Sequence, residues 1–395
     1  MPMPDTRPLI PEARSAVRAL AASRIRDIAN VAMHDPEVLA FWFGEPDEVT
    51  PAFIRDAATQ SLARGETFYA QNFGIPELRD EIAHYVSTLH RPTTADEIAV
   101  TASGMNALML AVEALVAPGD RVVVVTPLWP NLVEIPKILS AEVVCVPLRF
   151  AGNGWSLDLQ RLLDALTPGT RAMMLNSPNN PTGWTIDREA QRALLAHCDR
   201  HGIWIVADDV YERLYYAEDA RCAPSLLDVA ALGMRVISTN SFSKSWLMTG
   251  WRLGWIVAPA SLMPDLGKLI EYNTSCSPVF VQRAGVVAIR DGEPTVRATL
   301  ARFRHARDRL VGALQALPGV EVAPPSGAMY AFFRVDGVSD SMAFCRRLVE
   351  QVKLGLAPGS AFGPEGEGFV RWCFAASDAR LDEGIARLDR FLRAR

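Results

Sequence analysis

The chain has 395 residues, of which 49% are hydrophobic and 22% charged, and its formal net charge is −5 at pH 7. This composition is typical of a globular protein, and the acidic balance argues against binding to nucleic acid or to an anionic membrane surface. The N-terminus lacks a basic start followed by an apolar run, and no stretch of about 18 apolar residues exists, so we expect a cytoplasmic protein without a membrane segment. The six cysteines are scattered without a CxxC pair, which predicts free thiols and no metal site.

The N-terminal quarter of the chain predicts helices joined by turns. The first helix is expected from about residue 11 to residue 32. An apolar segment, FWFGEP at residues 41–46, stops at Gly44 and a proline turn. Further helices are expected to open at the Thr50-Pro51 and Pro76-Glu77 pairs, because proline is favoured in the first helical turn. Tyr69 lies in the irregular segment between them, where packing is its simplest role.

From residue 97 onward, apolar strands alternate with amphipathic helices. The strands are expected at residues 98–101, 122–125, 142–146, 172–175, 204–207 and 236–239. The helices between them are expected at residues 105–116, 130–140, 157–166 and 187–201. This alternation predicts an α/β fold with a mostly parallel sheet covered by helices on both faces. Such sheets bind ligands beyond the carboxyl ends of their strands.

The C-terminal part of the chain has a different pattern, in which helices precede short strands. A long helix is expected at residues 293–317 and two more at residues 340–352 and 379–393, with strands at residues 321–322, 329–334 and 369–374. We expect this part to pair with the N-terminal segment as a smaller α+β domain. The predicted division is residues 1–44 and 291–395 for the small domain and residues 45–290 for the large domain. The GPEGEG segment at residues 363–368 is a candidate mobile loop and does not match a dinucleotide fingerprint.

Unusual polar residues follow the predicted strands, where a ligand is expected. The first strand ends at Ser103-Gly104, where backbone N–H groups and the helix dipole favour an anion. A hydroxyl at Ser241 and a guanidinium at Arg252 suit a phosphate. Trp129 offers a flat face for stacking on a ring, and Asn180 and Tyr211 offer hydrogen bond donors. Taken singly, each of these residues also has an ordinary structural role as a cap, a turn former or a core residue.

Lys244 adds a chemically reactive group to these loops. Only four of the forty basic residues are lysines, and Lys244 lies in the apolar, hydroxyl-rich segment SFSKSW. A desolvated lysine can lose its proton and attack a carbonyl, which arginine cannot do. Asp208 follows a buried strand and needs a cationic partner there, although its neighbour Asp209 competes for this role. A ligand that uses all of these groups is pyridoxal 5′-phosphate, with a lysine Schiff base and a carboxylate on its ring nitrogen.

Five motifs resemble the class I/II aminotransferases of the fold-type-I pyridoxal-phosphate enzymes, over about residues 20–390. They are SFSKSWLMTGWRLGW (241–255), NSPNNPTG (176–183), ADDVYERLYY (207–216), TASGMNAL (101–108) and YAQNFGIPELR (69–79). The resemblance implies a mostly parallel, seven-stranded sheet and a homodimer with shared active sites. It implies that Lys244 forms the Schiff base and that Asp208 pairs with the pyridinium.

The resemblance also implies roles for the remaining candidate residues. Asn180 and Tyr211 would bind the phenolic oxygen, and Trp129 would stack on the ring. Four residues would hold the phosphate: Ser103, Gly104, Ser241 and Arg252. Tyr69 would reach the phosphate in the neighbouring subunit, and Met105 would lie beside the cofactor. Arg371, in FVRWCFA, would bind the substrate α-carboxylate, and the Gly44 backbone would approach the substrate.

These roles predict transfer of an amino group from an L-amino acid to a 2-oxo acid by a ping-pong mechanism, with Lys244 also carrying the proton. One aspartate-using bacterial subgroup has a lysine where this chain has Met105, and Phe41, Trp42 and Phe43 add apolar bulk near Gly44. We therefore expect apolar, aromatic or broad substrates.

Two alternatives remain open and two others are disfavoured. One is an aspartate aminotransferase whose arginine for the distal carboxylate is not recognised in the sequence. Another is a carbon–sulfur β-lyase, which would share Lys244 and Asp208. A cofactor-sensing regulator is disfavoured because the first forty residues are too few for a DNA-binding domain and the net charge is negative. A nicotinamide dehydrogenase is disfavoured by the missing glycine fingerprint.

Overall fold

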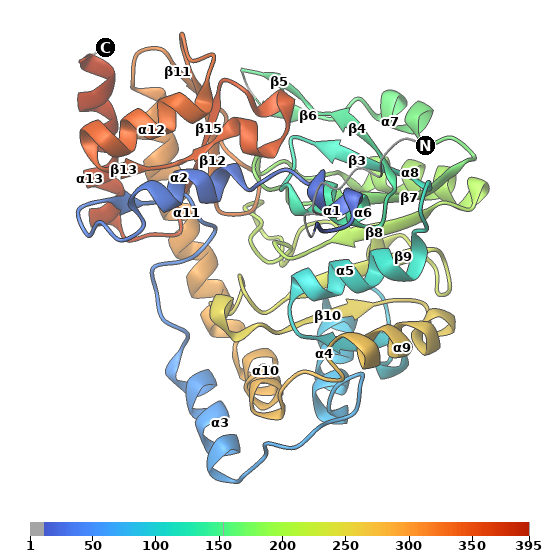
Figure 1. Ribbon diagram of the computed structural model, residues 1–395. Helices are drawn as coiled ribbons and strands as arrows, with labels where there is room; N and C mark the ends of the chain where they lie inside the picture. The colour runs from blue at the N-terminus through green and yellow to red at the C-terminus, as the bar shows by residue number, and fades with distance from the viewer. Residues whose placement is uncertain (1–11, 153, 395) are drawn as a thin grey trace, which may run out of the picture.

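A seven-stranded sheet forms the centre of the computed structural model, which describes residues 12–152 and 154–394 (Figure 1). In spatial order its strands are β2 (Ile98–Thr101), β10 (Gly254–Val257), β9 (Val236–Ser241), β8 (Trp204–Asp208), β7 (Thr170–Asn176), β3 (Arg121–Thr126) and β4 (Glu142–Pro147). Neighbouring strands from β9 to β4 run parallel, whereas β10 is antiparallel to both β2 and β9. The predicted α/β fold with a mostly parallel sheet is therefore confirmed.

The two faces of this sheet are covered by different helices, because alternate side chains of a strand point to opposite faces. Val122 and Val124 pack in a core with α5 (Gly104–Leu115), α6 (Asn131–Ile138) and α9 (Met263–Asn273). Val123 and Val125 pack in the opposite core with α4 (Pro76–Leu89), α7 (Leu159–Ala165), α8 (Arg188–His201) and α10 (Val279–Asp291). Helix α3 (Ala52–Ala63) packs on α10 at the edge of the molecule (Figure 1).

A second, four-stranded antiparallel sheet lies in the C-terminal part. Its order is β11 (Val320–Val322), β12 (Tyr330–Val335), β15 (Phe369–Cys373) and β14 (Ala357–Pro358). Three helices pack with it: α11 (Glu293–Gln315), α12 (Ser341–Val352) and α13 (Asp378–Arg393). The N-terminal strand β1 (Leu39–Ala40) pairs with β13 (Leu354–Gly355), so the two ends of the chain join here. On this basis we propose that residues 1–44 and 291–395 form the small domain and residues 45–290 the large domain.

The single helix expected at residues 11–32 is wrong. Residue 11 lies outside the described residues. The remaining range contains two separate helices, α1 (Ser15–Arg18) and α2 (Arg24–Ala32). The reason is Ser23, whose side chain accepts a hydrogen bond from the backbone N–H of Arg26 and so begins a new helix. This break matters because α2 starts beside the cavity described below.

Residues 254–257 form a strand that the sequence pattern did not predict. Their GWIV sequence is short and directly follows the polar segment that contains Lys244 and Arg252. Hydrogen bonds to β2 and β9 hold this strand in the sheet, so it places Arg252 back at the same edge as Ser241. In the described part of the chain, no helix is long and apolar enough to span a membrane.

Candidate active site

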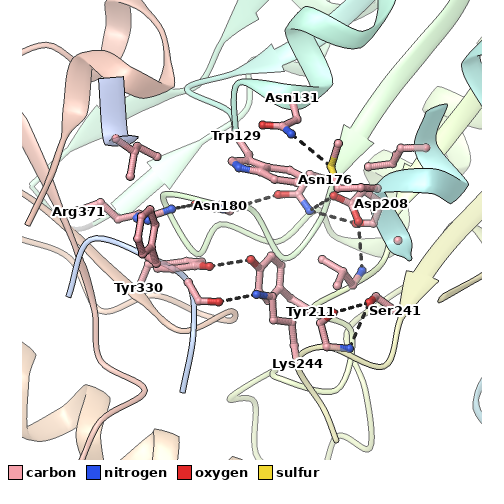
Figure 2. A pocket seen from close by; sticks show the side chains of 18 of the residues that line it. Trp129, Asn131, Asn176, Asn180, Asp208, Tyr211, Ser241, Lys244, Tyr330 and Arg371 are labelled. Atoms are coloured by element: carbon pink, nitrogen blue, oxygen red, sulfur yellow. Dashed lines mark hydrogen bonds between the residues drawn. The ribbon is translucent and has the colours of Figure 1, made fainter. Parts of the chain in front are cut away.

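A cavity of about 430 Å³ opens where the carboxyl ends of the parallel strands meet the C-terminal part of the molecule. Eleven of the thirteen residues singled out in the sequence line it: Gly44, Gly104, Met105, Trp129, Asn180, Asp208, Tyr211, Ser241, Lys244, Arg252 and Arg371. They come from segments that span more than 300 residues of the sequence, from Gly44 to Arg371. The fold therefore brings together most of the predicted constellation (Figure 2).

The other two candidates, Ser103 and Tyr69, do not line this cavity. The hydroxyl of Ser103 accepts a hydrogen bond from the Asn106 N–H over 2.9 Å, so its side chain caps α5. Tyr69 is 90% exposed and lies outside the cavity. The cofactor-binding roles of both residues stay predictions.

Lys244 lines the cavity, and its ammonium donates a hydrogen bond to the backbone carbonyl of Gly44. Burial lowers the pKa of Lys244 to about 8, from an ordinary value of 10.5. A substantial fraction of this amine is therefore neutral near pH 8, which is the state that can attack an aldehyde or remove a proton.

Asp208 is a buried carboxylate at the end of β8. Its oxygens accept hydrogen bonds from the Asn176 side chain over 3.2 Å and from the Val210 N–H over 3.4 Å. Burial, together with the charge of Asp209, raises the pKa of Asp208 to about 7. No basic side chain of the described residues forms an ion pair with Asp208, so a cationic ligand atom would stabilise its charged form.

Asp209, the alternative to Asp208 for the ring nitrogen, lies outside the cavity. Its carboxylate accepts hydrogen bonds from Ser238 over 2.6 Å and from Ser225 over 3.2 Å, and it does not line the cavity. Of the two neighbouring carboxylates, Asp208 is therefore the one that faces a ligand.

Arg371 lies on the opposite wall and is 2% exposed. It donates hydrogen bonds to the Asn180 side chain over 2.9 Å and to the backbone carbonyl of Trp42, while its Nε has no partner among the described residues. Its guanidinium carbon lies 4.4 Å from the ring centre of Tyr330 (Figure 2). A buried guanidinium without a carboxylate partner and with a free donor fits an incoming carboxylate.

The N-terminus of α5 and the segment around Ser241 form a tight cradle on the remaining side. A Cβ atom on Gly104 would lie 3.0 Å from the Ser241 Cβ, and one on Gly254 would lie 2.5 Å from the Gly104 nitrogen. Arg252 has a positive φ of 54° and donates a hydrogen bond to the Thr249 carbonyl over 2.8 Å. Only small residues fit here, so backbone N–H groups, hydroxyls and one guanidinium can approach a phosphate closely.

Several lining residues were not recognised in the sequence. Tyr330 is the most central of them, because its hydroxyl lies 2.7 Å from that of Tyr211 and a Cβ on Gly44 would lie 2.0 Å from its oxygen. Asn176 donates a hydrogen bond to Asp208, and Arg26 lines the cavity from α2. Of the apolar triplet before Gly44, only Phe43 lines the cavity, since Phe41 and Trp42 are buried in the C-terminal core.

The residues present fit pyridoxal 5′-phosphate. The cradle matches a phosphate, the unpaired Asp208 matches a protonated ring nitrogen, and the Lys244 amine matches an aldehyde. The fold and the site therefore define a pyridoxal-phosphate enzyme.

Residues 36–388 match the class I and II aminotransferase family, and the chain belongs to this family. It is 34% identical to aspartate aminotransferase of Pyrococcus horikoshii over 95% of this chain and 96% of the relative. It is also 34% identical to the arginine–pyruvate transaminase AruH of Pseudomonas aeruginosa, over 89% of both chains. The solved structure of aspartate aminotransferase from Thermotoga maritima superposes with a TM-score of 0.89 at 31% identity, covering 96% of this chain and all of the other. The protein is therefore a pyridoxal-phosphate-dependent aminotransferase that acts on amino acids and 2-oxo acids.

Proposed function

We propose that this aminotransferase transfers an amino group from an L-amino acid to a 2-oxo acid in two half-reactions at one site, with Lys244 as the lysine that binds the cofactor and carries the proton. The observation that supports this proposal best is the charge arrangement of the cavity. Lys244, Asp208 and Arg371 converge there, and neither Asp208 nor Arg371 forms an ion pair with another described side chain. Each of the three matches one group of the cofactor or substrate.

When bound, pyridoxal phosphate supplies an aldehyde and a ring that withdraws electrons from the substrate α-carbon. Arg371 binds the α-carboxylate and thereby sets the orientation of the substrate over the ring. Trp129 would pack beside the ring, and Asn180 and Tyr211 would donate to its phenolic oxygen. Asp208 keeps the ring nitrogen protonated, which favours electron withdrawal. Four more residues hold the phosphate in this scheme: Ser103, Gly104, Ser241 and Arg252.

Lys244 acts in two ways in this scheme. Its neutral amine would hold the cofactor through the aldehyde. When it is not bound to the aldehyde, this amine would be the base that moves the α-proton of the substrate. The Gly44 carbonyl accepts a hydrogen bond from Lys244, so it would orient the amine and would lie beside the substrate.

The cofactor-free protein is expected to take up pyridoxal 5′-phosphate faster as the pH rises to about 8, and at a constant rate above that pH. The sign follows from the lowered pKa of Lys244, because only the neutral amine attacks the aldehyde and its fraction saturates above the pKa. Stopped-flow absorbance at a series of pH values measures this rate. A rate that keeps rising towards pH 10.5, the ordinary lysine value, would contradict the assigned environment of Lys244.

For the substrates, we propose an apolar, aromatic or broad range. Met105, Leu108 and Phe43 line the cavity and provide apolar surface for a side chain. Broad specificity agrees with the diversity of the relatives, which are named for aspartate and for arginine with pyruvate. A panel of amino donors against 2-oxoglutarate and pyruvate, with both 2-oxo acid products quantified, tests the range. Activity with aspartate alone would contradict the proposed breadth.

We also propose a homodimer in which Tyr69 reaches the phosphate of the neighbouring site. Three aromatic side chains are almost fully exposed: Phe68 (84%), Tyr69 (90%) and Tyr272 (90%). The chain segments that carry Tyr69 and Tyr272 are adjacent, because Asn72 donates a hydrogen bond to Glu271 over 2.8 Å. Light scattering is expected to give twice the chain mass of 43.3 kDa. A monomer that is active at assay concentrations would contradict the shared site.

A further inference from the structure

We propose that Tyr330 is a positioning residue for the cofactor: its hydroxyl donates a hydrogen bond to the Tyr211 hydroxyl and so directs the Tyr211 proton towards the phenolic oxygen of pyridoxal phosphate. This inference rests on the proposed function, because it needs Tyr211 to contact that oxygen. Tyr330 begins β12 in the C-terminal part of the molecule, whereas Tyr211 follows β8 of the large sheet. The small sheet would therefore contribute to cofactor binding through a side chain of the large sheet.

The two hydroxyls share one hydrogen bond, although each of them has a proton. Their oxygens lie 2.7 Å apart, and burial raises the pKa of both phenols above the ordinary value of 10. Each phenol has a single proton to donate. The contact therefore uses the proton of one tyrosine and leaves the proton of the other for a further acceptor.

The surroundings of Tyr330 favour its hydroxyl as the donor of this pair. A Cβ atom on Gly44 would lie 2.0 Å from the Tyr330 oxygen, so the Gly44 backbone covers this oxygen closely. The Gly44 carbonyl already accepts a hydrogen bond from Lys244. Within the described part of the chain, the Tyr330 hydroxyl has no hydrogen bond apart from the one with Tyr211, so its buried proton is satisfied when it donates there.

The charge of Arg371 acts in the same direction. Its guanidinium carbon lies 4.4 Å from the ring centre of Tyr330, whereas no guanidinium of the described residues lies over the Tyr211 ring (Figure 2). A nearby positive charge favours loss of a phenolic proton and so makes the hydroxyl a stronger donor. Tyr330 is therefore the donor and Tyr211 the acceptor, and the Tyr211 proton is left for a ligand in the cavity that Tyr211 lines. Hydrogen bonds in such a chain strengthen one another.

The test is a pH titration of the absorbance band of the lysine-bound cofactor in the Tyr330→Phe holoenzyme. Phenylalanine keeps the ring beside Arg371 and removes only the hydroxyl. A donor to the phenolic oxygen stabilises its negative charge, so a weaker donor moves the midpoint of the titration to higher pH. We expect the midpoint to rise by about half to one pH unit, as for the loss of one hydrogen bond.

The sign of this shift reports the direction of the hydrogen bond between the two tyrosines. If Tyr211 instead donates to Tyr330, removal of the Tyr330 hydroxyl frees the Tyr211 proton for the cofactor, and the midpoint falls. A lower midpoint, or an unchanged one, would therefore overturn the proposal.

Two further variants show whether the hydroxyl acts through Tyr211. Tyr216→Phe is the matched control, because the buried Tyr216 hydroxyl donates to the Ala328 carbonyl over 2.6 Å but Tyr216 does not line the cavity. We expect this variant to leave the midpoint unchanged. In a Tyr211→Phe background, Tyr330→Phe is expected to add no further shift, because no Tyr211 proton remains to be directed. An equal shift in the control, or an additive shift in the double variant, would count against Tyr330.

Steady-state amino transfer by the same proteins separates this inference from the proposed function. Tyr330→Phe is expected to lower kcat about three- to tenfold and to keep KM for the amino donor within about twofold, since the ring beside Arg371 remains. A raised KM with an unchanged kcat would show that the hydroxyl serves Arg371 instead of Tyr211. A band that titrates as expected in an enzyme that exchanges no amino groups would overturn the proposed function and leave the role of Tyr330 supported.

Discussion

Lys244→Ala is expected to lower kcat for amino transfer by at least about ten-thousandfold and to remove the absorbance band of the lysine-bound cofactor. The physical reason is that Lys244 supplies both the amine that binds the aldehyde and the base that moves the α-proton. Alanine leaves no other amine among the described residues that line the cavity, whose remaining basic side chains are the guanidinium groups of Arg26, Arg252 and Arg371. Guanidinium groups stay protonated and cannot take over this function.

Lys268→Ala is the matched control for this change. Its ammonium forms a surface ion pair with Asp265 over 2.7 Å, and the Lys268 side chain is 71% exposed. An exposed pair of this kind contributes little to stability, so kcat and the absorbance spectrum are expected to match those of the parent enzyme. Full transamination by the Lys244→Ala protein, with an unchanged spectrum, would show that another group performs the chemistry.

Asp208→Asn is expected to lower kcat by about a hundred- to a thousandfold while the fold is retained. Asparagine has nearly the same shape and can still hydrogen-bond to Asn176. It carries no negative charge, however, so the ring nitrogen is no longer held in its protonated form. The measurements are kcat for one amino donor and the affinity for pyridoxal 5′-phosphate, which is also expected to fall.

Asp209→Asn distinguishes a role at the cofactor from a general effect of removing a buried carboxylate. Both carboxylates have a pKa raised to about 7, mainly by burial, but Asp209 contacts Ser225 and Ser238 outside the cavity. We expect Asp209→Asn to change the melting temperature with a much smaller change in kcat. Equal losses of kcat in the two variants would contradict the assignment of Asp208 to the ring nitrogen.

The strands and helices of the large sheet were predictable because each has a strong local signal. Val122 to Val125 form an apolar run between turns, and the strand β3 extends it by one residue at each end. The site residues that follow the strands were predictable because burying a polar group costs free energy unless it has a partner. A carboxylate such as Asp208, directly after a buried strand, therefore indicated a ligand. The carboxyl ends of parallel strands then bring them together.

Other parts of the site depend on long-range contacts that no local pattern shows. Tyr330 belongs to a strand more than one hundred residues after Tyr211, and the continuous apolar run around it only indicates a buried strand. The strand β10 exists because β2 and β9 hydrogen-bond to it on both sides. The position of Arg26 at the cavity was not predicted, because the start of α2 depends on the Ser23 cap, which breaks an otherwise continuous helical pattern.

The central claim is that this cavity holds pyridoxal phosphate and exchanges amino groups through it. Its most direct test is to mix the holoenzyme with one amino donor, without any 2-oxo acid acceptor, and to follow the absorbance and the products. We predict loss of the lysine-bound cofactor band, release of one 2-oxo acid per active site, and recovery of the band when a second 2-oxo acid is added. Continuous release of ammonia and pyruvate from a cysteine-like donor, or no spectral change with any donor, would contradict the account.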